Sequence, residues 1–322
     1  MIIHDPLASA SGELSSRAVR GVGVSTSPAP KRRRHSIGRQ LWWFAVPALV
    51  VYVTVVVSPT VQGIVMSSTD QTALAPTAKF IGTKNYVMVF STDAGAAAIR
   101  TLEIALAAMV IQNVLGLLLA VVLNGRVLGR NLLRTIIFAP VVVSPLVSGY
   151  LFQFLFGPPN VGAVNAVFHA LGLRQVVWLG QPNTALIVIV IVIGWQFTGS
   201  TMVIYLAGLQ GVPEEILEAA ALDGAGAFAR FWFVTRPFLA PAVIINLMLG
   251  LIGGLKVFDQ IFATTGGGPA GLTNTISTLI YQLITPLGNY GRASALAVLL
   301  AVAIAVLSII QFAVLRRREV KA

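Results

Sequence analysis

Few residues of this chain could do chemistry, and those that could lie inside long apolar stretches. Glu103, Lys256 and Asp259 are the ionisable residues placed clearly within such stretches. A charged group is costly in an apolar environment, so each is a candidate functional residue. Lys256 and Asp259 are three residues apart, a spacing that predicts one helical face. There they form either a structural ion pair or the polar lining of a solute path.

A second polar group lies between residues 195 and 201, again inside an apolar stretch. Trp195 offers an aromatic face for the CH patch of a sugar ring, while the Gln196 amide and the Ser200 hydroxyl suit its hydroxyl groups. These three residues, with Lys256 and Asp259, are the candidate substrate path. Hydrogen bonding between packed helices is the alternative role for such side chains.

The sequence does not favour a catalytic or metal centre. Cysteine is absent, and the three histidines, His4, His35 and His169, lie far apart. No cluster of acidic, histidine and serine residues points to an integral membrane enzyme. The chain also lacks the G-x-x-x-x-G-K-[ST] pattern that cradles nucleotide phosphates, so we expect it to bind no cofactor itself.

The composition indicates that these residues are carried by membrane-spanning helices. The chain is 56% hydrophobic and 10% charged, whereas soluble domains are roughly 25% charged. A span needs about 20 apolar residues in helical form. Six stretches qualify, and Pro145 predicts a bend in the third. They are residues 41–66, 101–123, 132–156, 184–209, 241–263 and 293–315.

Positive charge predicts the orientation of these spans. Sixteen of the 22 Lys and Arg residues fall in the two termini and in the loops after the second and fourth spans, and five fall in the alternate loops. Both termini are therefore expected in the cytoplasm. We expect a disordered basic tail over residues 1–40 and a short basic tail over 316–322. The basic run at 31–34 is interpreted as a topology determinant at the bilayer surface rather than a nucleic-acid site.

The loop over residues 211–241 is too long and too apolar for a simple connector. Glu214 and Glu215 favour a helix start, and Gly224 and Gly226 then interrupt the pattern. We expect two short helices with a sharp glycine turn between them. The aromatic residues of the second helix need burial in a partner's groove or against the ends of the spans.

Two motifs in this chain resemble those of binding-protein-dependent ABC importer permeases. The first resembles the EAA motif of that family and reads Glu218-Ala219-Ala220-Ala221-Leu222-Asp223-Gly224-Ala225. Its usual I-x-L-P close is replaced by Val234-Thr235-Arg236-Pro237. The second resembles the first permease subunit of maltose-like and glycerol-phosphate-like importers. It reads Phe258-Asp259-Gln260-Ile261, followed by Thr265-Gly266-Gly267-Gly268-Pro269. An ordinary alanine-rich loop and a plain turn are the alternative readings of the two motifs.

The resemblance implies an all-α membrane protein with six transmembrane helices and the type I ABC importer architecture, with a permease domain over 41–315. It implies a non-catalytic subunit for a sugar or sugar-like solute in the plasma or inner membrane. Its partners would be a second homologous permease, two ABC ATPases that use ATP and Mg²⁺, and an extracytoplasmic solute-binding protein. A secondary transporter is the alternative, although few carboxylates lie in the spans. The implied ATPase-docking residues are Glu218, Ala219, Ala220, Asp223, Gly224, Phe231 and Pro237.

Overall fold

A computed structural model describes residues 37–75, 77–90, 93–125, 127–285 and 287–319. Most of the tail predicted over 1–40 and the last residues of the tail predicted over 316–322 lie outside the described residues. The chain divides into two units, residues 1–54 and 55–322. The described part of the first unit is helix α1 (Ile37–Tyr52), which contains Pro47, and the start of the π-helix η1 (Val53–Val57).

The second unit is built from helices, and its described residues contain no strand beyond two isolated bridges, Thr69 with Phe80 and Thr72 with Ala75. The all-α prediction is therefore confirmed. The helices are α2 (Ser58–Met66), α3 (Lys84–Phe90), α4 (Ala94–Asn124), α5 (Arg130–Val142), α6 (Pro145–Leu155), α7 (Ala163–Ala170), α8 (Pro182–Gln210), α9 (Glu214–Leu222), α10 (Ala227–Ala229), η2 (Arg230–Thr235), α11 (Arg236–Phe238), α12 (Ala240–Leu255), α13 (Asp259–Thr264), α14 (Ile276–Ile284) and α15 (Tyr290–Glu319).

Four helical stretches among the described residues are long and apolar enough to cross a membrane: Phe44–Met66, Ala94–Asn124, Pro182–Gln210 and Tyr290–Arg317. Two bent pairs raise the number to six if each pair is one span. They are Arg130–Val142 with Pro145–Leu155, bent by 98°, and Ala227–Phe238 with Ala240–Leu255, bent by 70°. The bend predicted at Pro145 is confirmed.

The helix expected over residues 241–263 is not continuous, which corrects the sequence-based expectation. Helix α12 ends at Leu255 and α13 begins at Asp259, so residues 256–258 separate two helices. The backbone at Phe258 (φ −134°, ψ −60°) is not helical. Non-helical backbone at membrane depth is tolerated where protein or a cavity surrounds it.

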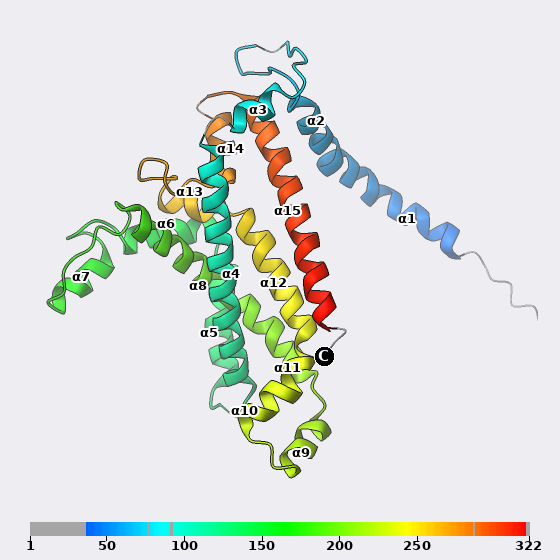
Figure 1. Cartoon of the computed structure of the whole chain (residues 1–322), viewed down its shortest axis with the longest axis vertical. Coiled ribbons are helices and arrows are strands. Elements are labelled where there is room, and N and C mark those ends of the chain that lie inside the picture. Colours follow the sequence, from blue (N-terminus) through cyan, green and yellow to red (C-terminus); the bar gives the residue numbers. More distant parts are fainter. Residues whose placement is uncertain (1–36, 76, 91–92, 126, 286, 320–322) are drawn as a thin grey trace, which may run out of the picture. The chain divides into compact units, whose positions relative to one another are not determined.

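The second unit is held together by α4 and α8, which pack along each other, with α12 against α4 (Figure 1). Close approach of α4 and α8 depends on Gly116, because a Cβ there would lie 2.6 Å from the Thr201 side chain. Within this unit, α3 and α14 lie at one end, and α9 and α10 lie at the opposite end (Figure 1).

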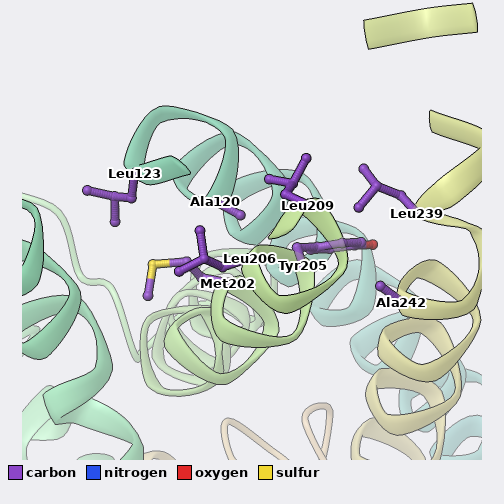
Figure 2. Packing of buried hydrophobic residues seen from close by; sticks show 8 residues of the cluster. All are labelled: Ala120, Leu123, Met202, Tyr205, Leu206, Leu209, Leu239 and Ala242. Atoms are coloured by element: carbon purple, nitrogen blue, oxygen red, sulfur yellow. The ribbon is translucent and has the colours of Figure 1, made fainter. Parts of the chain in front are cut away.

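One buried cluster, which we call the lower cluster, lies toward the end that carries α9 and α10. Figure 2 shows how its side chains from α4, α8 and the start of α12 converge. Mainly apolar side chains fill the space between three helices here. Movement of one helix therefore displaces the others. Its members are Ala120, Leu123, Met202, Tyr205, Leu206, Leu209, Leu239 and Ala242.

Candidate functional site

A cavity with a volume of about 290 Å³ lies among α4, α8, α12 and α13. It begins where Pro145 starts α6 and extends to the break between α12 and α13. Its wall combines apolar surface with a small number of polar groups, the usual composition of a small-molecule site. The polar groups come from Gln112, Ser200, Thr201, Asn246, Lys256, Asp259 and Gln260.

The break between α12 and α13 places Lys256 and Asp259 in this wall. The Lys256 N–H donates to the Ile252 carbonyl (3.3 Å) and the Gly253 carbonyl (3.2 Å), which closes α12. Asp259 begins the next helix, so the two residues do not share one helical face, and the sequence-based expectation was wrong on this point. Among the described residues the ion pair found is instead Arg100 with Glu103, at 2.7 Å. Lys256 and Asp259 are both exposed.

The structure brings three of the five substrate-path candidates together, namely Ser200, Lys256 and Asp259. The Ser200 hydroxyl donates to the Phe197 carbonyl at 2.8 Å. Trp195 is 38% exposed and lies outside the cavity wall, where its ring contacts Phe152 with centroids 5.3 Å apart.

Gln196 also lies outside the cavity wall and is completely buried. Its Nε2 donates to the Val143 carbonyl at 2.8 Å, and its Oε1 accepts a bond of 2.9 Å from Gln260. The alternative role considered for Gln196, a hydrogen bond between helices, is the one that the structure contains.

Gln112, Asn246 and Phe258 are among the cavity residues that the sequence-based substrate path did not include. Gln112 donates to the Ile193 carbonyl (3.4 Å), and Asn246 donates to the Thr201 carbonyl (3.3 Å). The signal for both was an amide within an apolar span, which indicates a helix contact but not which side of the helix faces a cavity.

The loop between α8 and α12 contains the predicted pair of short helices and the predicted glycine turn. Gly224 has φ +82°, directly after the end of α9. The Gly224 N–H donates to the Ala221 carbonyl (3.1 Å), and the Ala225 N–H donates to the Ala220 carbonyl (3.0 Å). These two bonds form a Schellman motif, which favours glycine at the left-handed position.

The predicted docking residues lie mostly on the surface of this loop. Glu218, Ala219, Asp223, Gly224 and Pro237 are exposed, Ala220 is half-buried, and Phe231 packs against the lower cluster. Large apolar residues near them are also exposed: Leu222 at 89%, Phe228 at 78% and Phe233 at 75%. Apolar surface gathered on one loop is typical of a protein-interaction site.

Arg236, where the sequence departs from the EAA pattern, has a local contact. Its guanidinium lies 4.4 Å from the centre of the Trp232 ring, and Trp232 stacks on Phe228 with centroids 6.1 Å apart. A guanidinium over an indole face is a favourable cation–π contact. The departure is therefore accommodated on the outside of the second short helix.

A continuous packed path joins the loop to the cavity. Phe231, in the loop, and Ile204, in the cavity wall, both pack against the lower cluster. The loop and the cavity are thus two ends of one packed assembly.

The family described as binding-protein-dependent transport system inner membrane component matches residues 112–320. This chain belongs to that family. The matched residues include the whole loop between α8 and α12, the α12–α13 break and α15.

Relatives of this family member match over most of their length. It is 35% identical to the multiple sugar-binding transport system permease protein of Streptococcus mutans, over 87% of this chain and 96% of the relative. It is 34% identical to the trehalose/maltose transport system permease protein of Thermococcus litoralis, over 85% and 92%. The lactose transport system permease protein of Rhizobium radiobacter is 32% identical, over 92% and 100%.

The fold is also that of a solved ABC transporter chain. A chain of a bacterial ABC transporter involved in the import of alginate matches with a TM-score of 0.76, covering 87% of this chain and 96% of that chain. The sequence identity is 23%, so this match establishes the shared fold. The predicted type I importer permease architecture is confirmed.

Proposed function

We propose that this permease subunit imports a sugar or sugar-like solute, driven by separate ATPases, and forms half of the translocation path. The observation that carries the proposal is the pairing of a polar cavity inside the spans with an exposed apolar loop, joined by the lower cluster. The names of the relatives, which include sugar permeases, support a carbohydrate solute.

The cavity has the groups that a polyhydroxylated solute needs. Lys256 can donate to a hydroxyl oxygen, and Asp259 can accept from a hydroxyl proton. Gln112 and Asn246 add amides, and the Phe258 ring offers an apolar face. Since Lys256 and Asp259 do not form an ion pair with each other, both charged groups are available to a solute.

The energy for import comes from partners in this proposal, because the sequence lacks a phosphate-binding loop. Helix α9, with Leu222 and Asp223 at its exposed end, docks on an ABC ATPase that binds ATP and Mg²⁺. A second, homologous permease completes the path, and a solute-binding protein delivers the sugar from outside. Both termini lie in the cytoplasm, and the chain itself catalyses no reaction.

Alternating access follows from the packed path. Closure of the ATPases on ATP draws the docking loops together, and displacement of Phe231 moves the lower cluster and the spans around it. The cavity then opens outward to receive solute. Hydrolysis of ATP returns the spans to their starting arrangement. Packed interiors deform little, so such a movement is transmitted rather than absorbed.

The test is reconstitution of this chain in liposomes with a second permease, an ATPase and a binding protein encoded beside it. Thermal-shift profiling of the binding protein identifies the sugars to assay. ATP-dependent uptake of a bound sugar is expected, and uptake should fall in Lys256→Ala. Uptake driven by an ion gradient without ATP would support a secondary transporter instead. Unchanged uptake in Lys256→Ala at normal expression would contradict the proposed path.

A further inference from the structure

Two helix breaks border the cavity, and a pair of buried amides joins them. The first break separates α5 from α6 at residues 143 and 144, and the second separates α12 from α13 at residues 256–258. Gln196 lies on α8 between them, and Gln260 lies in the first turn of α13. Both glutamines are buried, with 0% and 3% of their surface exposed.

The first break creates a need for a hydrogen-bond donor. Val143 follows α5 in an extended conformation (ψ 137°), so its carbonyl leaves the helical ladder. A buried carbonyl without a partner is unfavourable, and the Gln196 amide supplies the partner at 2.8 Å. The geometry accounts for an amide at residue 196 of α8.

The second break is fixed by the other end of the same amide. Gln196 Oε1 accepts from Gln260 Nε2 at 2.9 Å, and Gln260 lies just after Asp259 at the start of α13. Helices α6 and α13 also touch closely, since a Cβ at Gly149 would lie 2.5 Å from the Ala263 Cβ. The Val143 carbonyl, Gln196 and Gln260 thus form one chain of hydrogen bonds across three helical elements.

We propose that Gln196 and Gln260 are positioning residues that set the separation of the two helix breaks and thereby the shape of the cavity. Gln196 acts without touching the solute, because its amide nitrogen and oxygen are both bonded and it lies outside the wall. Gln260 orients the start of α13, which carries Asp259. The inference rests on the proposed function only in taking the cavity as the place where solute binds.

The shape of the cavity can be measured separately from transport. The chain has no cysteine, and Gly253 lies exposed in the cavity wall with no atom within 4 Å of an added Cβ. Gly253→Cys therefore provides a single reporter thiol in this chain. Its labelling by a small maleimide is followed by mass spectrometry in the assembled complex, with Gln196 intact and with Gln196→Met, which keeps the side-chain length and removes both hydrogen bonds.

We expect Gln196→Met to change the labelling rate of Gly253→Cys about threefold to tenfold, the range of one or two lost hydrogen bonds. Gly95→Cys, at the start of α4 and also with open space around its Cβ, should label at an unchanged rate. Gln62→Met on the exposed face of α2 is the matched substitution and should change neither rate. An unchanged Gly253→Cys rate in Gln196→Met would overturn the inference.

A double mutant tests whether the two glutamines act as one unit. Gln196→Met should raise the solute KM about threefold to tenfold without lowering the basal ATPase rate, and Gln260→Met should do so less, because it keeps the bond to Val143. Adding Gln260→Met to Gln196→Met should have no further effect on the labelling rate of Gly253→Cys, a readout that does not depend on contact between Gln260 and solute. Fully additive effects would contradict a single positioning unit. If Gln196→Met does not assemble, the same two readouts on Gln260→Met decide the question.

The two proposals fail in different ways. If the wild-type complex imports no sugar, the proposed function fails, but the labelling of Gly253→Cys still reports on the cavity. If the wild type imports sugar and the glutamine variants change neither labelling nor KM, the positioning role alone is wrong.

Discussion

The loop over residues 211–241, which is the proposed docking loop, and the cavity are organised in opposite ways. The loop exposes apolar side chains such as Leu222 and Phe228 and is shaped by bonds between residues three to five apart. The cavity keeps polar side chains inside an apolar bundle and is shaped by bonds such as that between Gln196 and Gln260, which are 64 residues apart. The first region leaves apolar surface exposed, while the second leaves polar groups facing a cavity.

The largest effect is expected from Gly224→Asp, which places a side chain at the left-handed turn of the docking loop. A side chain at φ +82° is strained by roughly 1 kcal/mol, and it would project from the exposed turn. We expect uptake to fall to background while membrane insertion is retained, as measured by sugar uptake and membrane fractionation. Gly226→Ala is the matched control, since Gly226 has φ −65° and open space around its Cβ. Normal uptake and normal ATPase co-purification in Gly224→Asp would refute the docking role.

Phe231 and Leu222 distinguish packing within this chain from docking on the ATPase. Phe231→Ala removes a side chain packed on the lower cluster and should lower the unfolding free energy by about 1–2 kcal/mol, less than a fully buried phenylalanine. Leu222→Ala removes an exposed side chain and should leave stability unchanged while weakening ATPase association. The thermal midpoint of the purified subunit and ATPase pull-down distinguish the variants. An equal loss of stability in both would show that the loop is not divided in this way.

Lys256→Met tests whether the polar groups of the cavity bind the solute. Loss of a charged hydrogen bond to a solute hydroxyl costs about 1.5–3 kcal/mol, which corresponds to roughly a tenfold or greater rise in the solute KM. Asp259→Asn should have a smaller effect, because the amide oxygen still accepts a hydrogen bond. Concentration-dependent uptake in proteoliposomes gives both values. A Lys256→Met variant with a wild-type KM would remove Lys256 from the solute site.

The smallest effect is expected from Arg236→Leu, which restores the pattern typical of the family. The substitution removes the contact between the guanidinium and Trp232, worth about 0.5–1 kcal/mol at an exposed site. The thermal midpoint should fall slightly, and uptake should stay within about twofold of wild type. Trp232→Leu removes the same contact together with the stacking of Trp232 on Phe228, so its thermal midpoint should fall further. A large loss of uptake in Arg236→Leu alone would assign Arg236 a direct role in docking.

The docking loop was predictable because its structure is local. Glycine at residue 224, after a short run of helix-forming residues, was sufficient to predict the turn. The spans and the bend at Pro145 were predictable for the same reason, since hydrophobicity and proline act on the segment that contains them.

The cavity was only partly predictable because its residues meet through long-range contacts. A polar side chain in an apolar span can face either a neighbouring helix or a cavity, and the residue type alone does not distinguish them. Gln196 was expected in the substrate path and is instead bonded to Val143 and Gln260. The break after Leu255 was missed because Gly253 and Gly254 weaken a helix without requiring it to end.

The lower cluster also has a mechanical consequence. Its side chains lie between Phe231 and Ile204, which both pack against it, and close-packed protein interiors have low compressibility. A displacement applied at Phe231 therefore reaches Ile204 with little elastic loss. In the proposed transport cycle, the movement of the cavity wall is then set by how far the loop moves, because little of that movement is lost in the lower cluster.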